Sequence, residues 1–95
     1  MLSPLEALVL DLLALRSPTY GLDLVASSAG RLKRGTVYVT LGRMEQKGFV
    51  RSRVEERPGA GPPRRLYEPT ALGLRALVAS QLLAGDLPLG ARPRQ

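Results

Sequence analysis

The sequence predicts one small, mainly α-helical domain that carries a single β-hairpin. Three observations predict this class. Apolar residues recur at helical spacing in four segments, a stretch before the last of these alternates with a period of two, and prolines and glycines interrupt that alternation. The chain has 95 residues, 44% of them hydrophobic, which suits one folded domain with a thin core. Because so small a core benefits from further burial, we expect a second subunit to complete it.

The first predicted helix begins at a capping box, in which Ser3 precedes Pro4 and Glu6. Leucines and valines recur at helical spacing from there to about Arg16, and further apolar residues occupy the other sides of the helix. This helix is therefore expected to be buried on more than one face. It is either a central core helix or a helix with one face on the core and another against a second subunit.

The next two predicted helices cover residues 19–29, closed by Gly30, and residues 34–47, closed by Gly48. The buried stripe of the third helix is predicted to consist of Val37, Leu41 and Met44. At about 100° per residue, the opposite side presents a mixture of donor, amide, hydroxyl and methyl groups, which is suited to reading base edges. The residues on that side are Thr36, Val39, Gly42, Arg43 and Gln46. Gly42 indicates either close approach of another surface or a tolerated loss of helix propensity.

A two-stranded hairpin is predicted after Gly48, where Val50, Ser52 and Val54 alternate with charged residues. Its tip is the proline- and glycine-rich segment 58–63, and arginines flank that tip. The tip is either a charged contact surface or an ordinary surface turn. Thr70 then caps a fourth amphipathic helix that runs to about Ala84, and residues 86–95 are expected to form a flexible tail.

The basic charge is concentrated in the middle of the chain. The whole sequence has a net charge of +6, whereas residues 31–66 hold ten Lys and Arg against three Asp and Glu, a net charge of +7. Such a field favours a polyanionic partner, although arginine-rich codon usage is an alternative source of the charge. Lys33 and Arg34 also lie at the positive end of the third helix dipole, where a phosphate would offset their repulsion.

The missing residue types argue against an enzyme. The sequence has no cysteine and no histidine, so it has no disulfide, no thiolate nucleophile, no cysteine-ligated zinc and no imidazole base. We expect neither a cofactor nor a metal. The N-terminal stretch lacks a basic leader and contains Glu6 and Asp11, which fits neither a signal peptide nor a membrane span. A cytoplasmic location without membrane association is therefore expected.

Together the predicted elements describe a winged helix-turn-helix followed by a C-terminal dimerisation helix. In this arrangement the third helix enters the major groove of DNA, and the hairpin forms the wing that lies along the backbone or minor groove. The predicted organisation is a DNA-binding domain over residues 1–69, a dimerisation helix over residues 70–85 and a flexible tail over residues 86–95.

Four ordered motifs then resemble the PadR family of bacterial transcriptional regulators: LSPLEALVLDLLA, PTYGLDL, RGTVYVTLGRMEQKGFV and RRLYEPTALGLRAL. The resemblance covers about Leu2 to Leu77 and implies that the third helix reads DNA. It assigns Gly35, Thr36 and Tyr38 to the Gly-Thr-x-Tyr signature of the family, Arg43 and Glu45 to its Arg-x-Glu stretch, and Arg64 and Arg65 to the basic pair before Tyr67.

Two departures from the family pattern fall on the third helix. Lys33 and Arg34 replace a common Ser-Pro pair, and Val39 replaces a proline, so the operator sequence of relatives does not carry over. The resemblance also implies dimerisation through the C-terminal helix, with help from the first helix. Longer members of the family bind phenolic or drug-like effectors near the interface. This chain has little length for such a pocket, and no feature of its sequence supports an effector.

The resulting hypothesis is a homodimeric repressor that binds double-stranded DNA at a near-palindromic operator. The expected DNA-binding residues are Lys33, Arg34, Gly35, Thr36, Tyr38, Val39, Arg43, Gln46, Lys47, Arg57, Arg64 and Arg65. The expected dimer interface consists of Leu5, Leu8, Leu12, Leu74, Leu77, Val78 and Leu82. The alternatives are a sequence-independent nucleic-acid-binding module and a winged-helix module that binds another protein.

Overall fold

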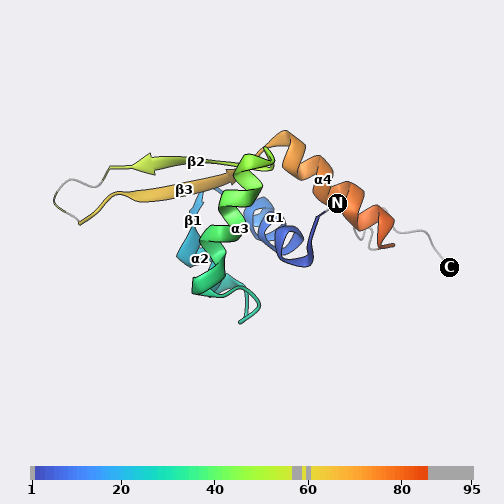
Figure 1. Ribbon diagram of the computed structural model, residues 1–95, viewed down its shortest axis with the longest axis horizontal. Coiled ribbons are helices and arrows are strands. Elements are labelled where there is room, and N and C mark those ends of the chain that lie inside the picture. The colour runs from blue at the N-terminus through green and yellow to red at the C-terminus, as the bar shows by residue number, and fades with distance from the viewer. Residues whose placement is uncertain (1, 57–58, 60, 86–95) are drawn as a thin grey trace.

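The computed structural model describes residues 2–56, 59 and 61–85. Its elements in chain order are α1 (Pro4–Leu15), β1 (Thr19–Tyr20), α2 (Gly21–Ser27), α3 (Arg34–Gln46), β2 (Val50–Glu55), β3 (Arg64–Pro69) and α4 (Ala71–Leu83). The β2–β3 hairpin extends to one side of the helices α1 to α3, and α4 extends to the opposite side (Figure 1). The predicted tail, residues 86–95, lies outside the described residues.

Helix α1 lies at the centre of the fold. Its predicted capping box is confirmed, because the Ser3 hydroxyl accepts a hydrogen bond from the Glu6 N–H at 3.1 Å and the Glu6 carboxylate accepts one from the Ser3 N–H at 2.9 Å. Val9, Leu10 and Leu13 are fully buried. The helix contacts α2, α3, α4 and β3, which explains why apolar residues are distributed around it.

The sheet has one strand more than the sequence predicted. Its order is β1-β3-β2 and all pairs are antiparallel. Thr19 and Tyr20, expected to begin the second helix, instead pair with Tyr67 and Leu66 along the free edge of β3. Both residue types favour strands, and the pairing satisfies backbone groups of β3 that would otherwise be left at an edge. The second helix consequently begins at Gly21.

The second helix also ends earlier than predicted, at Ser27. The Ser28 hydroxyl donates to the Val25 carbonyl at 2.8 Å and accepts from the Leu32 N–H at 3.0 Å, which ties the following turn to the helix end. Ala29 and Gly30 then adopt positive φ angles of 54° and 83°. These two residues redirect the chain toward α3, so the predicted stop at Gly30 is part of a longer turn.

Helix α3 and the hairpin agree with their predicted bounds. The stripe of Val37, Leu41 and Met44 is fully buried, as the spacing predicted. Strands β2 and β3 pair from Val50 opposite Pro69 to Glu55 opposite Arg64. We refer to this hairpin as the wing. At its tip, residues 57, 58 and 60 lie outside the described residues, so the predicted contact residue Arg57 has no described position.

Helix α4 buries only one narrow side. Of its residues, Gly73 and Leu77 are buried, whereas Leu72, Leu74, Val78, Leu82 and Leu83 are exposed. Two of the residues expected at a dimer interface, Leu77 at 6% exposure and Leu8 at 8%, belong to the core of the single chain. Both residues are members of the same hydrophobic core cluster, and the helices that carry them, α1 and α4, pack on each other. The sequence pattern alone did not distinguish that internal contact from an external one.

Candidate nucleic-acid interface

The outer face of α3 is an open surface with mixed chemistry. The residues that helical spacing placed on this face are all exposed: Thr36, Val39, Gly42, Arg43 and Gln46. A Cβ atom built on Gly42 meets no atom within 4 Å, so no neighbour among the described residues approaches it. The side chains of Lys33, Arg34 and Arg43 form no hydrogen bond or ion pair with the described part of the chain. Donors on this face are therefore available to another molecule.

The start of α3 concentrates positive charge. Lys33 is the N-cap residue and makes no side-chain capping hydrogen bond, and the first turn contains no acidic residue. Lys33, Arg34 and Gly35 are all exposed. Backbone N–H groups and the helix dipole add to the charge of the two side chains at this end, an arrangement that attracts an anion.

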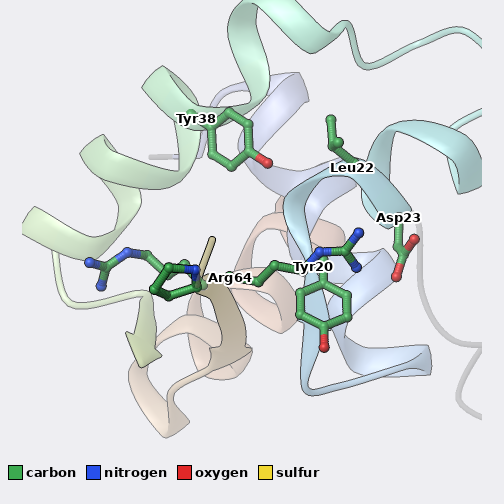
Figure 2. Close-up of a pocket in the computed structure, with 7 residues that line it drawn as sticks. Tyr20, Leu22, Asp23, Tyr38 and Arg64 are labelled. Atoms are coloured by element: carbon green, nitrogen blue, oxygen red, sulfur yellow. The ribbon is translucent and has the colours of Figure 1, made fainter. Parts of the chain in front are cut away.

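A pocket separates the middle of α3 from the wing. Its volume is about 250 Å³, and it is lined by Tyr20, Leu22, Asp23, Tyr38, Pro63, Arg64 and Arg65. In Figure 2 the side chain of Arg64 extends toward Tyr20, while Tyr38 on α3 and Leu22 and Asp23 on α2 form other walls. The pocket thus combines two phenol rings with two guanidinium groups at the junction of α2, α3 and the wing.

Tyr38 occupies a confined position in this pocket. A Cβ atom on Gly21 would lie only 2.7 Å from Cε1 of the Tyr38 ring, so a glycine is needed for α2 to approach the ring this closely. The ring is nevertheless half-exposed. Tyr38 therefore supports the contact between α2 and α3 while presenting part of its ring to the outside.

Tyr20 connects the wing to the helical part of the domain. Its hydroxyl donates a hydrogen bond to the Glu55 carboxylate, and the guanidinium carbon of Arg64 lies 4.8 Å from the centre of its ring. The predicted second helix, residues 19–29, includes Tyr20 in its first turn, and no role in the site was predicted for this residue. Its role depends on the pairing of β1 with β3, which links residues 46 or 48 positions apart and leaves no local signal in the sequence.

A second connection joins the wing to α3. Arg65 Nη1 donates to the Ser52 hydroxyl at 3.1 Å, and that hydroxyl donates to Glu45 Oε2 at 2.8 Å. Burial raises the pKa of the Tyr67 hydroxyl. The positive charge of Arg65 opposes this rise, and the negative charge of Glu45 adds to it. Arg64 and Arg65 thus contact different parts of the domain, which ties the half of the wing nearest its tip to β1 and, through Ser52, to α3.

Lys47 is already engaged within the chain. Its ammonium group lies 2.7 Å from the Glu6 carboxylate, which is almost completely buried, while about half of the Lys47 side chain is exposed. Burial would raise the pKa of the Glu6 carboxyl, but the hydrogen bonds from Lys47 and Ser3 and the charge of Lys47 outweigh burial and lower it. The predicted phosphate contact of Lys47 therefore competes with a contact that ties α3 to α1.

The comparison with protein families decides the identity of this fold. The model of the transcriptional regulator PadR-like family matches residues 9–79. The chain belongs to the PadR-like family. Its members are transcriptional regulators, which are not enzymes. No curated protein matches the chain. No helix in the described residues is both long and apolar enough to cross a membrane.

Solved structures of PadR family regulators share the fold. A PadR family transcriptional regulator from Eggerthella lenta is 34% identical, with a TM-score of 0.74 over 84% of this chain and 70% of that protein. A PadR family regulator from Clostridium difficile is 26% identical, with the same TM-score over 85% of this chain and 86% of its own. Bacillus subtilis PadR, solved in complex with operator DNA, is 20% identical, with a TM-score of 0.71 over 97% of this chain and 53% of its own.

Proposed function

We propose that this PadR-like regulator is a homodimeric repressor that binds a near-palindromic operator in double-stranded DNA through α3 and the wing. The observation that carries the proposal is the outer face of α3, where the side chains of Lys33, Arg34 and Arg43 form no hydrogen bond or ion pair with the described residues. Helices that read DNA present such free donors to base edges and phosphates. The operator complex of Bacillus subtilis PadR supports this use of the shared fold.

The proposed contacts divide into two groups. Side chains near the middle of α3 read bases: Thr36, Tyr38, Val39, Arg43 and Gln46. Cationic side chains bind phosphates and supply most of the affinity: Lys33, Arg34, Lys47, Arg57, Arg64 and Arg65. Gly35 lets the DNA backbone approach the start of the helix, since a Cβ built on it meets no atom within 4 Å and the space beside it is open.

The proposed dimer uses the exposed apolar residues that α1 and α4 do not cover within one chain. These are Leu5, Leu74, Val78 and Leu82, together with the partly buried Leu12. A monomer that leaves four leucines and one valine of a single helix exposed to water loses the free energy of burying them. In this proposal residues 1–69 form the DNA-binding domain and residues 70–85 form the dimerisation helix.

The proposal is tested by selecting bound sequences from a pool of random duplexes with the full chain. We expect a consensus of two inverted half-sites whose centres are separated by about 34 to 36 Å, one turn of DNA. The selected duplex, placed across a promoter, is expected to lower transcription of a reporter when the protein is present. Selection without any consensus would instead favour the sequence-independent module, for which salt would weaken binding to every duplex equally.

The protein-interaction alternative predicts a different result. If the apolar face of α4 binds another protein and α3 has no DNA target, the chain would bind the selected and the random duplexes with the same weak affinity. The cations of α3 argue against this alternative, because Lys33, Arg34 and Arg43 form no hydrogen bond or ion pair with the described residues and create a positive field suited to a polyanion.

A further inference from the structure

The beginning of α4 is attached to the turn that ends α3. The Thr70 hydroxyl donates a hydrogen bond to the Gly48 carbonyl at 2.6 Å, and the Thr70 N–H donates to the Phe49 carbonyl at 3.0 Å. The same hydroxyl accepts from the Gly73 N–H at 3.0 Å and so caps α4. One side chain therefore joins the first turn of α4 to the residues that follow α3.

Gly73 brings the two segments into direct backbone contact. A Cβ atom at this position would lie 2.1 Å from the Phe49 carbonyl oxygen and 2.9 Å from its carbon. Neither atom belongs to a flexible side chain that could turn aside. Any larger residue at position 73 would consequently push α4 away from the turn.

The turn itself is fixed to the last residues of α3. The Gly48 N–H donates to the Glu45 carbonyl at 3.0 Å, and the Phe49 N–H donates to the Met44 carbonyl at 2.9 Å. Met44 is fully buried in the core. Helix α3, the turn and the start of α4 thus form one junction in which each part is held by hydrogen bonds to the next.

From this junction we infer that Thr70 and Gly73 are positioning residues that set the distance between the two α3 helices of the dimer, and hence the half-site spacing that the protein accepts. The inference rests on the proposed homodimer. Helix α4 has 13 residues and is about 20 Å long. A small change of its angle at Thr70 therefore becomes a larger displacement at its far end. Neighbouring base pairs are only about 3.4 Å apart along the DNA axis.

The experiment measures affinity for duplexes that carry the two half-sites selected from the random pool. In one duplex the half-sites have the selected spacing, and in two others one base pair is added or removed. A duplex with a single half-site is the control for binding by one subunit. For the unchanged protein we expect about a tenfold loss of affinity when the spacing changes by one base pair. Thr70→Val removes the hydroxyl and keeps the branched shape. We expect it to reduce that loss to about threefold or less, with unchanged affinity for the single half-site.

Thr70→Ser is the matched control, because it keeps the hydroxyl and should retain the spacing preference of the unchanged protein. Gly73→Ala is the second variant, and we expect it to shift the preferred spacing by one base pair. If Thr70 only caps α4, Thr70→Val should have a lower melting temperature and the same preference among spacings as the unchanged protein. That result overturns the inference. If the unchanged protein instead bound duplexes of every spacing with the same affinity, the proposed dimer would be wrong, and the inference with it.

Discussion

The two ends of the domain expose opposite chemistries. The outer face of α3 and the wing carry cations and polar groups, whereas α4 exposes leucines and Val78. The wing and α4 extend to opposite sides of the helices α1 to α3 (Figure 1). Both surfaces are supported by the same central helix, α1, which contacts α3 and α4. A small domain can therefore keep a charged and an apolar surface apart by placing its most buried helix between them.

The cations of the charged surface also differ among themselves. Lys33, Arg34 and Arg43 on α3 form no internal side-chain contact in the described residues, whereas Arg51, Arg64 and Arg65 on the wing each contact another side chain. The cations of α3 can therefore bind a partner without losing an internal side-chain contact, whereas each of these wing arginines is already in contact with a side chain of the domain. Substitutions on α4 and on the charged surface should separate dimerisation from DNA binding. Substitutions on α3 and on the wing should separate base reading from phosphate binding.

The largest effect is expected from Val78→Asp on α4. A carboxylate placed in the proposed apolar interface would be buried without a partner, so the dimer should dissociate and operator affinity should fall by about a hundredfold or more. Val78 is 48% exposed, so the single chain should stay folded. Sedimentation velocity measures the dimer and gel shift the affinity.

The matched control is Val54→Asp on the wing, where the valine is 47% exposed. This variant should stay dimeric, since its position lies on the charged surface. If both variants dissociated, or neither did, the assignment of the apolar surface to the dimer would be wrong.

A smaller effect, of a different kind, is expected from Arg43→Ala on α3. Loss of a contact with a base should cost about 1 to 3 kcal/mol and relax the preference at one operator position. Arg64→Ala, on the wing, should weaken binding to all sequences alike and reduce the dependence on salt. Affinities for a set of single-base operator variants measure both. An unchanged preference in Arg43→Ala would remove this arginine from the base-reading group.

Next in size is the effect of Glu6→Gln on stability. Because the folded state lowers the pKa of Glu6 below its ordinary value of 4.5, the charged carboxylate stabilises the fold above that pH, and this contribution is lost as the pH falls through the lowered pKa. The substitution should cost about 1 to 2 kcal/mol at pH 7 and progressively less in acid. Urea unfolding at pH 7 and at pH 3 measures the difference. An equal cost at both pH values would contradict the role of the charge.

The smallest effect is expected from Arg51→Ala. Its ion pair with Glu68 is 2.7 Å long but solvent-exposed, and such pairs contribute about 0.2 to 1 kcal/mol. Thermal unfolding should therefore change little, and salt should reduce the change further. A loss as large as that of Glu6→Gln would mean that the wing depends on its internal ion pairs more than its exposure suggests.

Local patterns predicted most of the helices and the wing. The capping box at Ser3, the buried stripe of Val37, Leu41 and Met44, and the alternation after Gly48 are signals within a few residues of each other, and each was confirmed. The outer face of α3 followed from the same stripe by helical geometry. Its exposure is confirmed, whereas its contact with DNA stays a prediction.

Contacts between distant residues could not be predicted in this way. The strand at Thr19 depends on the edge of β3, and the partner of Lys47 is Glu6, 41 residues earlier. Leu8 and Leu77 have the same apolar character as their exposed neighbours, and only the packing of the helices in three dimensions decides that they are core residues. In each case the deciding partner belongs to another part of the sequence.

The contact between Arg64 and Tyr20 has a consequence for the entropy of binding. A free arginine on a hairpin samples many rotamers, and fixing such a side chain in a complex costs about 0.5 to 1.5 kcal/mol. Here the ring of Tyr20, itself held by Glu55, already restricts Arg64 before any partner arrives. Part of that entropy is therefore lost during folding, and the wing would reach a phosphate with the rotamers of this arginine already restricted.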